Sequence, residues 1–226
     1  MRSSCRRMPR NTGRDQILVR LSSGETIVDF RKAVNDVRLP LVMPSSPPAH
    51  GAVHLRAFRA DDVPMLQDLA TDPYVPMTGT LPARADRAQA LAYIDRQHER
   101  LATGAGYSFC VALRDSDEGV GQAGLSLTAI EAGRASAGYA VAPQFRGSGV
   151  AAQALTALTD FAWTLLELQR IELYIEPWNI ASRRTAETAG YEPEGLVKQH
   201  QVIGGRRVDM LLHSAVRSPR QLSAEV

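Results

Sequence analysis

The residues best suited to chemistry lie in segment 135–151, where an apolar run ends in a glycine-bearing loop and a second apolar run follows. The first run predicts a strand that ends near Val141, and the second predicts a helix from Val150. Backbone N–H groups at a helix start lack partners and lie at the positive end of the helix dipole, so they suit a phosphate or pyrophosphate. Gly147 and Gly149 carry no Cβ and would let the backbone approach those oxygens. The segment therefore predicts a phosphate-binding loop.

Two known phosphate motifs can be compared with this loop. A nucleoside-triphosphate loop requires Lys and then Ser or Thr after its glycines, whereas Val150 and Ala151 stand here, so that class is excluded. The spacing Gly147-x-Gly149-x-x-Ala152 does match a loose dinucleotide fingerprint. However, a further stretch separates the strand from the first glycine, and the segment follows predicted hairpins instead of opening a βαβ unit. A nicotinamide-dependent oxidoreductase therefore stays open only as a weaker alternative.

A second group of polar residues lies along and after the next predicted strand. Glu172, Tyr174 and Glu176 alternate and would share one strand face, which is either solvated or a source of a catalytic base. Asn179 and Ser182 follow this strand. Both residue types are favoured at helix N-caps, so helix capping explains their presence as well as catalysis does.

Together these two segments resemble the GNAT superfamily of CoA-dependent N-acyltransferases. The first matches the Q/R-x-x-G-x-G/A signature of the superfamily through Gln144, Gly147 and Gly149. The second is similar to the N-x-x-S…G-F…E-G pattern of the branch that acetylates the N-termini of ribosomal proteins, through Asn179, Ser182, Gly190-Tyr191 and Glu194-Gly195. The likeness extends from about residue 53 to residue 214.

The resemblance implies an α/β (α+β) fold with a mixed, mostly antiparallel central sheet, helices on both faces and a pair of strands that splay apart at the cofactor site. Hydrophobic periodicity predicts a compatible order of elements, β-α-α-β-β-β-α-β-α-β-β. The predicted strands are 53–57, 107–113, 120–127, 135–141, 171–175, 196–203 and 206–212. The predicted helices are 61–69, 82–101, 150–166 and 182–189.

We expect one GNAT-like domain at residues 51–215. Residues 1–50 would form a partly disordered N-terminal extension, and residues 216–226 would form a C-terminal tail. Met8 and Met43 are alternative starts, so part of the extension could be a start-site artefact.

The resemblance also implies roles in binding acetyl-CoA, the expected acyl donor and co-substrate. Val141 would pair its backbone with the pantetheine arm. Six consecutive residues would cradle the pyrophosphate: Arg146, Gly147, Ser148, Gly149, Val150 and Ala151. Asn179 would contact the pantetheine near the thioester, and Ser182 would protonate the departing CoA thiolate.

Three positions depart from the pattern of the family. Where many members have a tyrosine as general acid, seven residues after the asparagine, this chain has Ala186. The ribosomal branch often has a glutamate two residues before the Gly-Tyr pair of the strand that precedes the glycine loop. In this chain that pair is Gly138-Tyr139, and Ser136 stands at the position of the glutamate. Where another glutamate is proposed as the base, it has Gln201, and the adjacent His200 would point to the other strand face. The usual base is missing, and Glu172 is our candidate for a catalytic carboxylate.

The absence of the usual base affects which kind of amine we expect as the acceptor of the acyl group. An α-amine has a reference pKa near 7.7–8.0 and a lysine amine has one near 10.4. The difference of about 2.5 units corresponds to roughly 3.4 kcal/mol for obtaining the neutral nucleophile. A site with a weak base therefore favours a peptide N-terminus or a small-molecule amine over an internal lysine.

Composition and charge exclude several other classes of protein. The chain has 226 residues, 44% of them hydrophobic, and no stretch approaches the roughly 18 apolar residues of a membrane span. Two cysteines and five scattered histidines provide neither a disulfide framework nor a metal cluster. Residues 1–40 are basic, but the rest has no basic stretch with interleaved aromatics. We expect a cytoplasmic protein without metal, membrane or nucleic-acid partner, which could form a homodimer.

The expected reaction is direct transfer of an acyl group, most simply acetyl, from acyl-CoA to a primary amine. The protein would mainly supply orientation and backbone donors for the thioester carbonyl. The three departures also motivate an alternative, in which a catalytically degenerate fold binds CoA as a sensor or interaction module.

Overall fold

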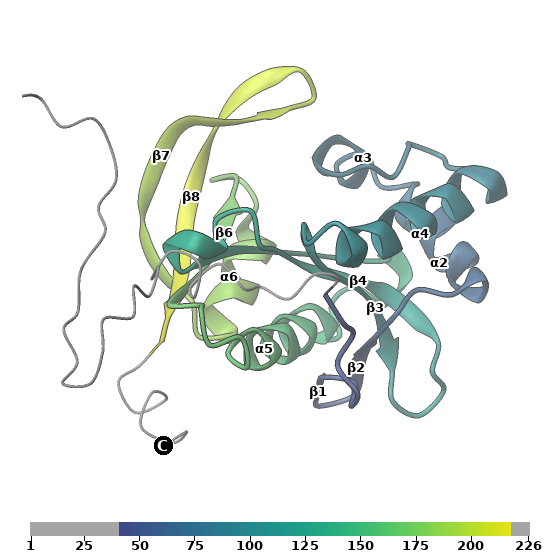
Figure 1. The fold of residues 1–226 in the computed structure, drawn as a ribbon. Coiled ribbons are helices and arrows are strands. Elements are labelled where there is room, and N and C mark those ends of the chain that lie inside the picture. The colour runs from purple at the N-terminus through teal and green to yellow at the C-terminus, as the bar shows by residue number, and fades with distance from the viewer. Residues whose placement is uncertain (1–40, 218–226) are drawn as a thin grey trace, which may run out of the picture. The chain divides into compact units, whose positions relative to one another are not determined.

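The computed structural model describes residues 41–217, which form one eight-stranded sheet (Figure 1). The strands follow the order β1-β2-β3-β4-β5-β6-β8-β7 across the sheet. Their bounds are β1 Ala49–His50, β2 Val53–Arg56, β3 Gly106–Leu113, β4 Gly119–Ser126, β5 Arg134–Val141, β6 Arg170–Ile175, β7 Glu192–Ile203 and β8 Arg206–Val216. Neighbouring strands are antiparallel except β5 and β6, which run parallel. The expected mixed, mostly antiparallel sheet is confirmed, and the short β1 is additional to the prediction.

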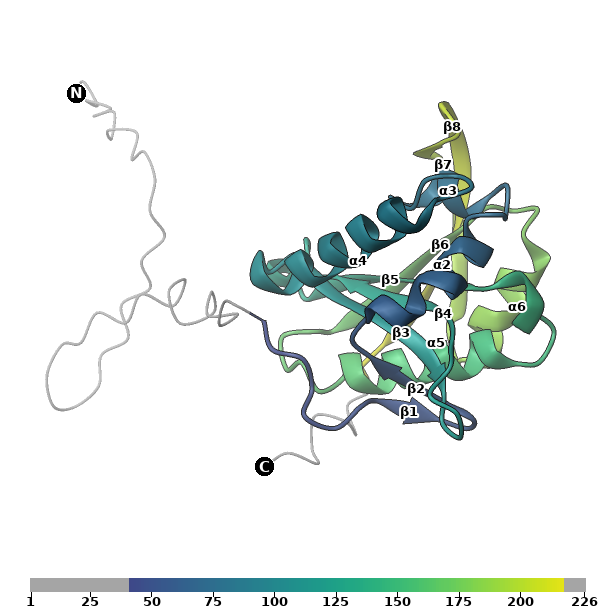
Figure 2. The same ribbon diagram turned by 90° about the vertical axis from the view of Figure 1, so that its right-hand side faces the viewer.

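Helices cover both faces of the sheet, as expected (Figure 2). They are α2 Val63–Leu69, α3 Val75–Thr78, α4 Arg87–Ala102, α5 Val150–Ala162 and α6 Ile180–Thr188. One cluster of buried apolar residues includes Leu155 and Leu158 of α5 and joins this helix to the sheet. A second cluster includes Leu66 of α2 and Ile94 of α4. The two faces of the sheet are thus buried separately, with α2 and α4 on one side and α5 on the other.

All four predicted helices differ from the structure in their bounds, and α4 and α5 differ by more than two residues at one end. Helix α4 begins at Arg87 rather than at residue 82, because Asp86 caps it. The Gln89 N–H donates to Asp86 Oδ1 at 2.8 Å, and the Gln89 side chain accepts the Asp86 N–H at 3.0 Å. Helix α5 ends at Ala162 rather than at residue 166, and Leu166 is exposed.

The parallel strands β5 and β6 separate part-way along their length. They pair at three positions, Arg134 with Arg170, Ala135 with Ile171 and Ser136 with Glu172. Beyond Ser136, β5 continues along β4 to Val141, and β6 continues along β8 to Ile175. Since each strand keeps its other neighbour, the two facing edges open into a gap. This gap is the splayed strand pair that the resemblance implies.

The folded part of the chain extends past the boundaries expected at residues 51 and 215. Leu41 is buried, and its N–H donates to the Leu101 carbonyl at 3.0 Å. At the other end, the buried Arg217 guanidinium donates to the carbonyls of Leu168 and Trp163, each at 2.8 Å. The disorder expected near the N-terminus concerns residues outside the described range. Among residues 41–217, no helix is long and apolar enough to span a bilayer.

Candidate active site

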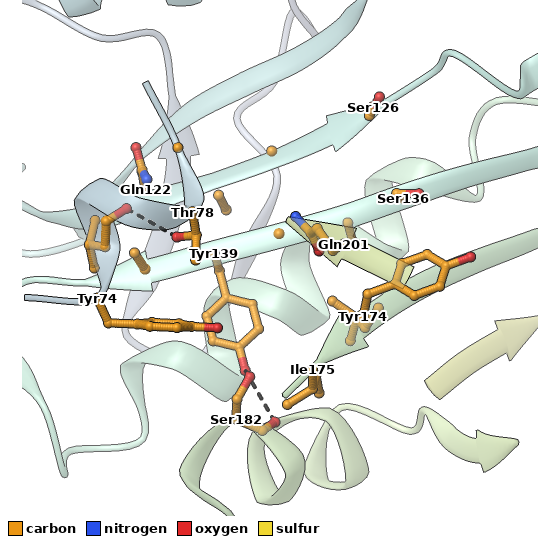
Figure 3. Close-up of a pocket in the computed structure, with 18 of the residues that line it drawn as sticks. Tyr74, Thr78, Gln122, Ser126, Ser136, Tyr139, Tyr174, Ile175, Ser182 and Gln201 are labelled. Atoms are coloured by element: carbon orange, nitrogen blue, oxygen red, sulfur yellow. Dashed lines mark hydrogen bonds between the residues drawn. The ribbon is translucent and has the colours of Figure 1, made fainter. Parts of the chain in front are cut away.

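A cavity of about 430 Å³ opens at the gap between β5 and β6 (Figure 3). Its walls come from the middle of β4 and β5, the end of β6, helices α3, α4 and α6, and the end of β7. The polar residues of the wall include Tyr74, Ser136, Tyr139, Glu176, Asn179 and Ser182. The cavity therefore brings the predicted Asn179 and Ser182 to the splayed edge of β5.

The predicted phosphate loop lies between β5 and α5. Gly147 and Gly149 both have a φ of 79°, in the left-handed region that favours glycine. A Cβ added at Gly147 would meet no atom within 4 Å, so the space beside this residue is open. The first turn of α5, from Val150, has backbone N–H groups without intrahelical acceptors. These features fit a phosphate group, and because the loop does not line the cavity, it would hold a different part of an extended ligand.

Arg146 is held on two sides within this loop. Its Nε donates to the Val141 carbonyl at 3.0 Å, and its Nη1 lies 2.7 Å from Asp72 Oδ2. Burial opposes ionisation of Asp72, but hydrogen bonds from two backbone N–H groups and from Arg146 hold the pKa of this carboxyl below its ordinary value. The Arg146 side chain remains 46% exposed, so it can contact a phosphate from a fixed position.

Val141 turns its peptide groups toward the gap. The Ala142 N–H donates to the Val120 carbonyl at 2.9 Å, so these two residues form a hydrogen-bonded pair of the β4–β5 ladder. Hydrogen-bonded and non-hydrogen-bonded pairs alternate along an antiparallel ladder, so Val141 and Tyr139 direct their N–H and C=O groups away from β4. Because the Val141 carbonyl accepts the Arg146 Nε, Val141 offers its N–H to the gap, where the resemblance expects the pantetheine arm.

Asn179 and Ser182 belong to the start of α6. Asn179 is the N-cap residue and its Oδ1 accepts the Ser182 N–H at 3.0 Å, so the capping role is present. Both residues nevertheless line the cavity. The Ser182 Oγ lies 2.8 Å from the Tyr139 hydroxyl, which also donates to the Ser182 carbonyl at 3.2 Å (Figure 3). The serine hydroxyl is therefore held across the gap, between β5 and α6.

The two glutamates on the polar side of β6 have different surroundings. Glu172 is buried, lies 2.9 Å from Arg170 Nε, accepts the Tyr174 hydroxyl at 3.0 Å, and does not line the cavity. Glu176 follows β6, is 9% exposed and does line the cavity. Burial, and then the carboxylate of Glu176, raise the pKa of the Tyr74 hydroxyl. The buried carboxylate of the cavity is thus Glu176, whereas Glu172 belongs to an ion-pair network beside it.

The positions that depart from the family pattern lie in different places. Ser136 and Gln201 line the cavity, so both give it neutral side chains where the resemblance expects carboxylates. Ala186 is completely buried. His200, expected on the opposite face from Gln201, stacks on the ring of Tyr174 with 4.2 Å between centroids. A register shift in β7 just before Gln201 interrupts the simple alternation on which that expectation depended.

Two tyrosines of the site are missing from the sequence prediction. The strand pattern accounts for Tyr139 without giving it a role, although it is a single large polar side chain among small residues just before the glycine loop. Tyr74 lines the cavity from the connection just before α3, a short helix that the sequence patterns do not predict. In the part of the chain that the structure describes, no group of three His, Cys, Asp or Glu residues could hold a metal ion.

The splayed sheet, the glycine loop and the cavity between them define a class of acyl-transferring enzyme. Residues 52–192 match the family model of the acetyltransferase (GNAT) domain, and the chain belongs to this family. It is therefore an enzyme of the GNAT N-acetyltransferase type.

Individual relatives agree with this assignment. An uncharacterized N-acetyltransferase, p20 of Bacillus licheniformis, is 28% identical over 163 residues, which cover 72% of this chain and 92% of that protein. The solved structure of Mycobacterium smegmatis RimJ in complex with CoA-disulfide is similar at a TM-score of 0.66 and 26% identity, covering 81% of this chain and 97% of that one. A ribosomal-protein-S5-alanine acetyltransferase from Vibrio fischeri shares the fold at a TM-score of 0.60 and 18% identity, covering 77% and 98%.

Proposed function

We propose that this protein transfers the acetyl group of acetyl-CoA to a primary amine, either at a peptide N-terminus or on a small molecule. One observation carries the proposal. Beyond Ser136, the edge of β5 opposite β4 has no strand paired with it and faces the cavity, which contains the Ser182 hydroxyl and the buried Glu176 carboxylate. A linear ligand along this edge would reach Ser182 at one end and the glycine loop at the other. Two relatives support acetyl-CoA as the donor: the solved structure of RimJ contains CoA-disulfide, and p20 is named as an N-acetyltransferase.

Acetyl-CoA would be held by the residues expected from the sequence. Val141 would bind the pantetheine arm through its backbone, Asn179 and Ser182 would lie near the thioester, and the pyrophosphate would contact Arg146, Gly147, Ser148, Gly149, Val150 and Ala151. The donor supplies an acetyl group already activated as a thioester. The residues of the chain supply orientation, and the cavity limits access of water. The cytoplasmic location and the homodimer stay predictions.

The amine would enter from the side of α3 and Glu176. We assign the role of base to Glu176 in preference to Glu172, because Glu176 lines the cavity. A buried carboxylate attracts a protonated amine and can then accept its proton. Because an α-amine has a reference pKa near 7.7–8.0, it needs less help from such a group than a lysine does.

The cofactor is tested by the melting temperature of the full chain with acetyl-CoA, CoA, succinyl-CoA, NAD and ATP in parallel. Micromolar binding at saturating ligand should stabilise the protein by a few kcal/mol, which gives a visible shift. We expect a shift with CoA species alone. A shift with NAD alone, or with none of the five, would contradict the proposal.

The alternative of a CoA-binding module without catalysis is tested by turnover. CoA thiol release is followed with a panel of amines, in the wild type and in Ser182→Ala. Release that depends on the amine and falls in the variant supports an enzyme. Tight acetyl-CoA binding with no release for any amine would favour the module.

A further inference from the structure

A serine alone is a poor source for the proton that the departing CoA sulfur needs. An aliphatic hydroxyl is about as weak an acid as water, and its pKa lies far above that of a thiol. A thiol of the cysteine type has a pKa near 8.5, so its thiolate draws a proton from an isolated serine only with difficulty. A tyrosine, with a reference pKa near 10, is a much closer match.

We propose that the Tyr139 hydroxyl supplies this proton through Ser182, a role that rests on the proposed acetyl transfer. The two hydroxyl oxygens are 2.8 Å apart, which is the usual distance for an O–H···O hydrogen bond. Tyr139 comes from β5 and Ser182 from α6, so the pair bridges the gap where the thioester would lie (Figure 3). Tyr139 is a positioning residue: it orients the serine and restores its proton, while Ser182 faces the sulfur.

The surroundings of the other candidate groups favour Tyr139. Ala186, at the position where many relatives have their tyrosine acid, has no hydroxyl and is completely buried. The other tyrosines of the cavity wall lie beside different partners: Tyr74 beside Glu176, Tyr93 beside Gln122 and Tyr174 beside Glu172. The tyrosine that completes the proton path thus lies on β5 instead of at position 186 of α6, and Ser182 of α6 remains the group that faces the sulfur.

Tyr139 is also in the right protonation state. Burial raises its pKa, and hydrogen bonds with Ser182 and Thr185 oppose this only in part. The phenol therefore carries its proton throughout the neutral range. Glu176 and Arg100 are the charged groups that line the same cavity.

The proposed transfer conserves atoms and charge. As the C–S bond breaks, its electron pair goes to the sulfur, which takes the Ser182 Oγ proton. At the same time the Tyr139 O–H turns from the Ser182 carbonyl, 3.2 Å away, to the Ser182 Oγ, 2.8 Å away, and gives it a proton, which leaves a phenolate. The amine nitrogen gives one proton to Glu176 as it becomes an amide, and Glu176 then returns a proton to the Tyr139 phenolate through water.

Four variants of the full chain test this role: Tyr139→Phe, Ser182→Ala, the double variant and Tyr107→Phe. Tyr107 is a matched control, because it is buried against Phe109 and Phe161, away from the cavity. We expect Tyr139→Phe to lower kcat by about 10–100-fold with the KM for acetyl-CoA changed less than about twofold, since a positioned acid contributes to the transition state. Two residues that act as one unit are non-additive, so the double variant should be no slower than Ser182→Ala. A kcat within about twofold of wild type in Tyr139→Phe, or fully multiplicative losses, would overturn the proposal.

A second measurement needs no amine and reports the pKa of the thiol of bound CoA. The rate at which iodoacetamide alkylates bound CoA, followed against pH, reports the pKa of the CoA thiol. If Tyr139 had only a structural role, the pKa of the CoA thiol would be the same in Tyr139→Phe as in the wild type. We expect the thiol pKa to rise by at least about half a unit in the variant, because the hydrogen-bonded chain of donors that stabilises the thiolate is lost. Wild-type protein that neither binds CoA nor turns over would contradict the proposed function itself. Normal CoA binding with an unchanged thiol pKa and unchanged kcat would contradict only the role of Tyr139.

Discussion

Arg146 and Asp72 form an ion pair of 2.7 Å that joins the glycine loop to the segment before α3. Asp72 also accepts the N–H groups of Tyr74 and Val75, at the start of this short helix. The loop expected to hold the pyrophosphate and the wall expected to meet the amine are therefore connected through one carboxylate. Disturbing Asp72 should affect both.

The first prediction concerns this pair. Arg146→Gln should weaken acetyl-CoA binding by about tenfold, since it removes a charge-assisted contact with phosphate. Asp72→Asn should weaken it by a smaller factor, because the guanidinium keeps its charge but loses its fixed position. Isothermal titration with acetyl-CoA gives both values. Arg87→Gln, which removes an exposed arginine on α4, is the matched control, and an equal loss there would point to a general charge effect.

The second prediction concerns the conformation of the loop. Alanine at Gly147 or Gly149 must adopt a φ of 79°, which costs about 1–2 kcal/mol for a residue with a Cβ. Each substitution should lower the free energy of unfolding by about this amount, measured by urea denaturation. Gly138→Ala is the control, because an added Cβ there meets nothing within 4 Å and its φ is not in the left-handed region. Equal stability of all three variants would be evidence against a strained loop.

The third prediction separates the two glutamates. Glu176→Gln should lower kcat at neutral pH by about 10–100-fold while the protein stays folded, since it replaces the carboxylate of the cavity by an amide. Glu172→Gln should instead lower stability, because Arg170 loses a buried partner 2.9 Å away. Steady-state kinetics and thermal melts on both variants distinguish the catalytic role of Glu176 from the stabilising role of Glu172. A reversed outcome would return the role of base to Glu172.

The fourth prediction concerns stability against pH. Asp62 and Arg56 form a buried pair, with Oδ1 and Nη2 2.8 Å apart and side chains 2% and 8% exposed. Burial opposes the charge of Asp62, but hydrogen bonds from Arg56 and the Arg59 N–H hold its pKa below the ordinary value. A carboxyl with a lowered folded-state pKa stabilises the fold above its unfolded pKa of about 3.9, and this stabilisation is lost as pH falls through the folded pKa.

The melting temperature should therefore fall steeply as the pH drops below about 4. Asp62→Asn should be less stable by about 1.5–3 kcal/mol at pH 7, because Arg56 loses its buried charged partner and keeps Asp117, 2.9 Å from its Nε. The melting temperature of this variant should depend less on pH in the acid range. Calorimetry from pH 3 to pH 7 on both proteins measures this. Parallel curves for the two would show that Asp62 does not carry the acid sensitivity.

Much of the fold could be predicted because local pattern and tertiary structure agree. The glycine loop before Val150 is one case, since its left-handed residues are glycines and an apolar helix follows directly. Asn179 is another, because its residue type favours the N-cap that it occupies. Such features depend on neighbours in the sequence.

The rest depends on contacts between distant segments. The pairing of Tyr139 with Ser182 joins β5 to α6, and nothing in either segment alone indicates it. The difference between Glu172 and Glu176 also arises from tertiary structure. Glu172 lies within β6 opposite Ser136, whereas Glu176 follows the strand, beyond the point where β5 and β6 separate, and lines the cavity. The place of His200 depends on a register shift that alternation does not predict.

Acetyl transfer to a defined amine is the most direct test of the proposed function. The full chain is incubated with acetyl-CoA and two peptides of one sequence, one with a free N-terminus and an acetylated lysine, the other with an acetylated N-terminus and a free lysine. A small diamine is the third acceptor, and products are identified by mass spectrometry. We expect an acetylated α-amine or small amine, formed at least about tenfold faster than acetyl-lysine at pH 7, with equal release of CoA. Firm acetyl-CoA binding without any acetylated product would contradict the proposed function.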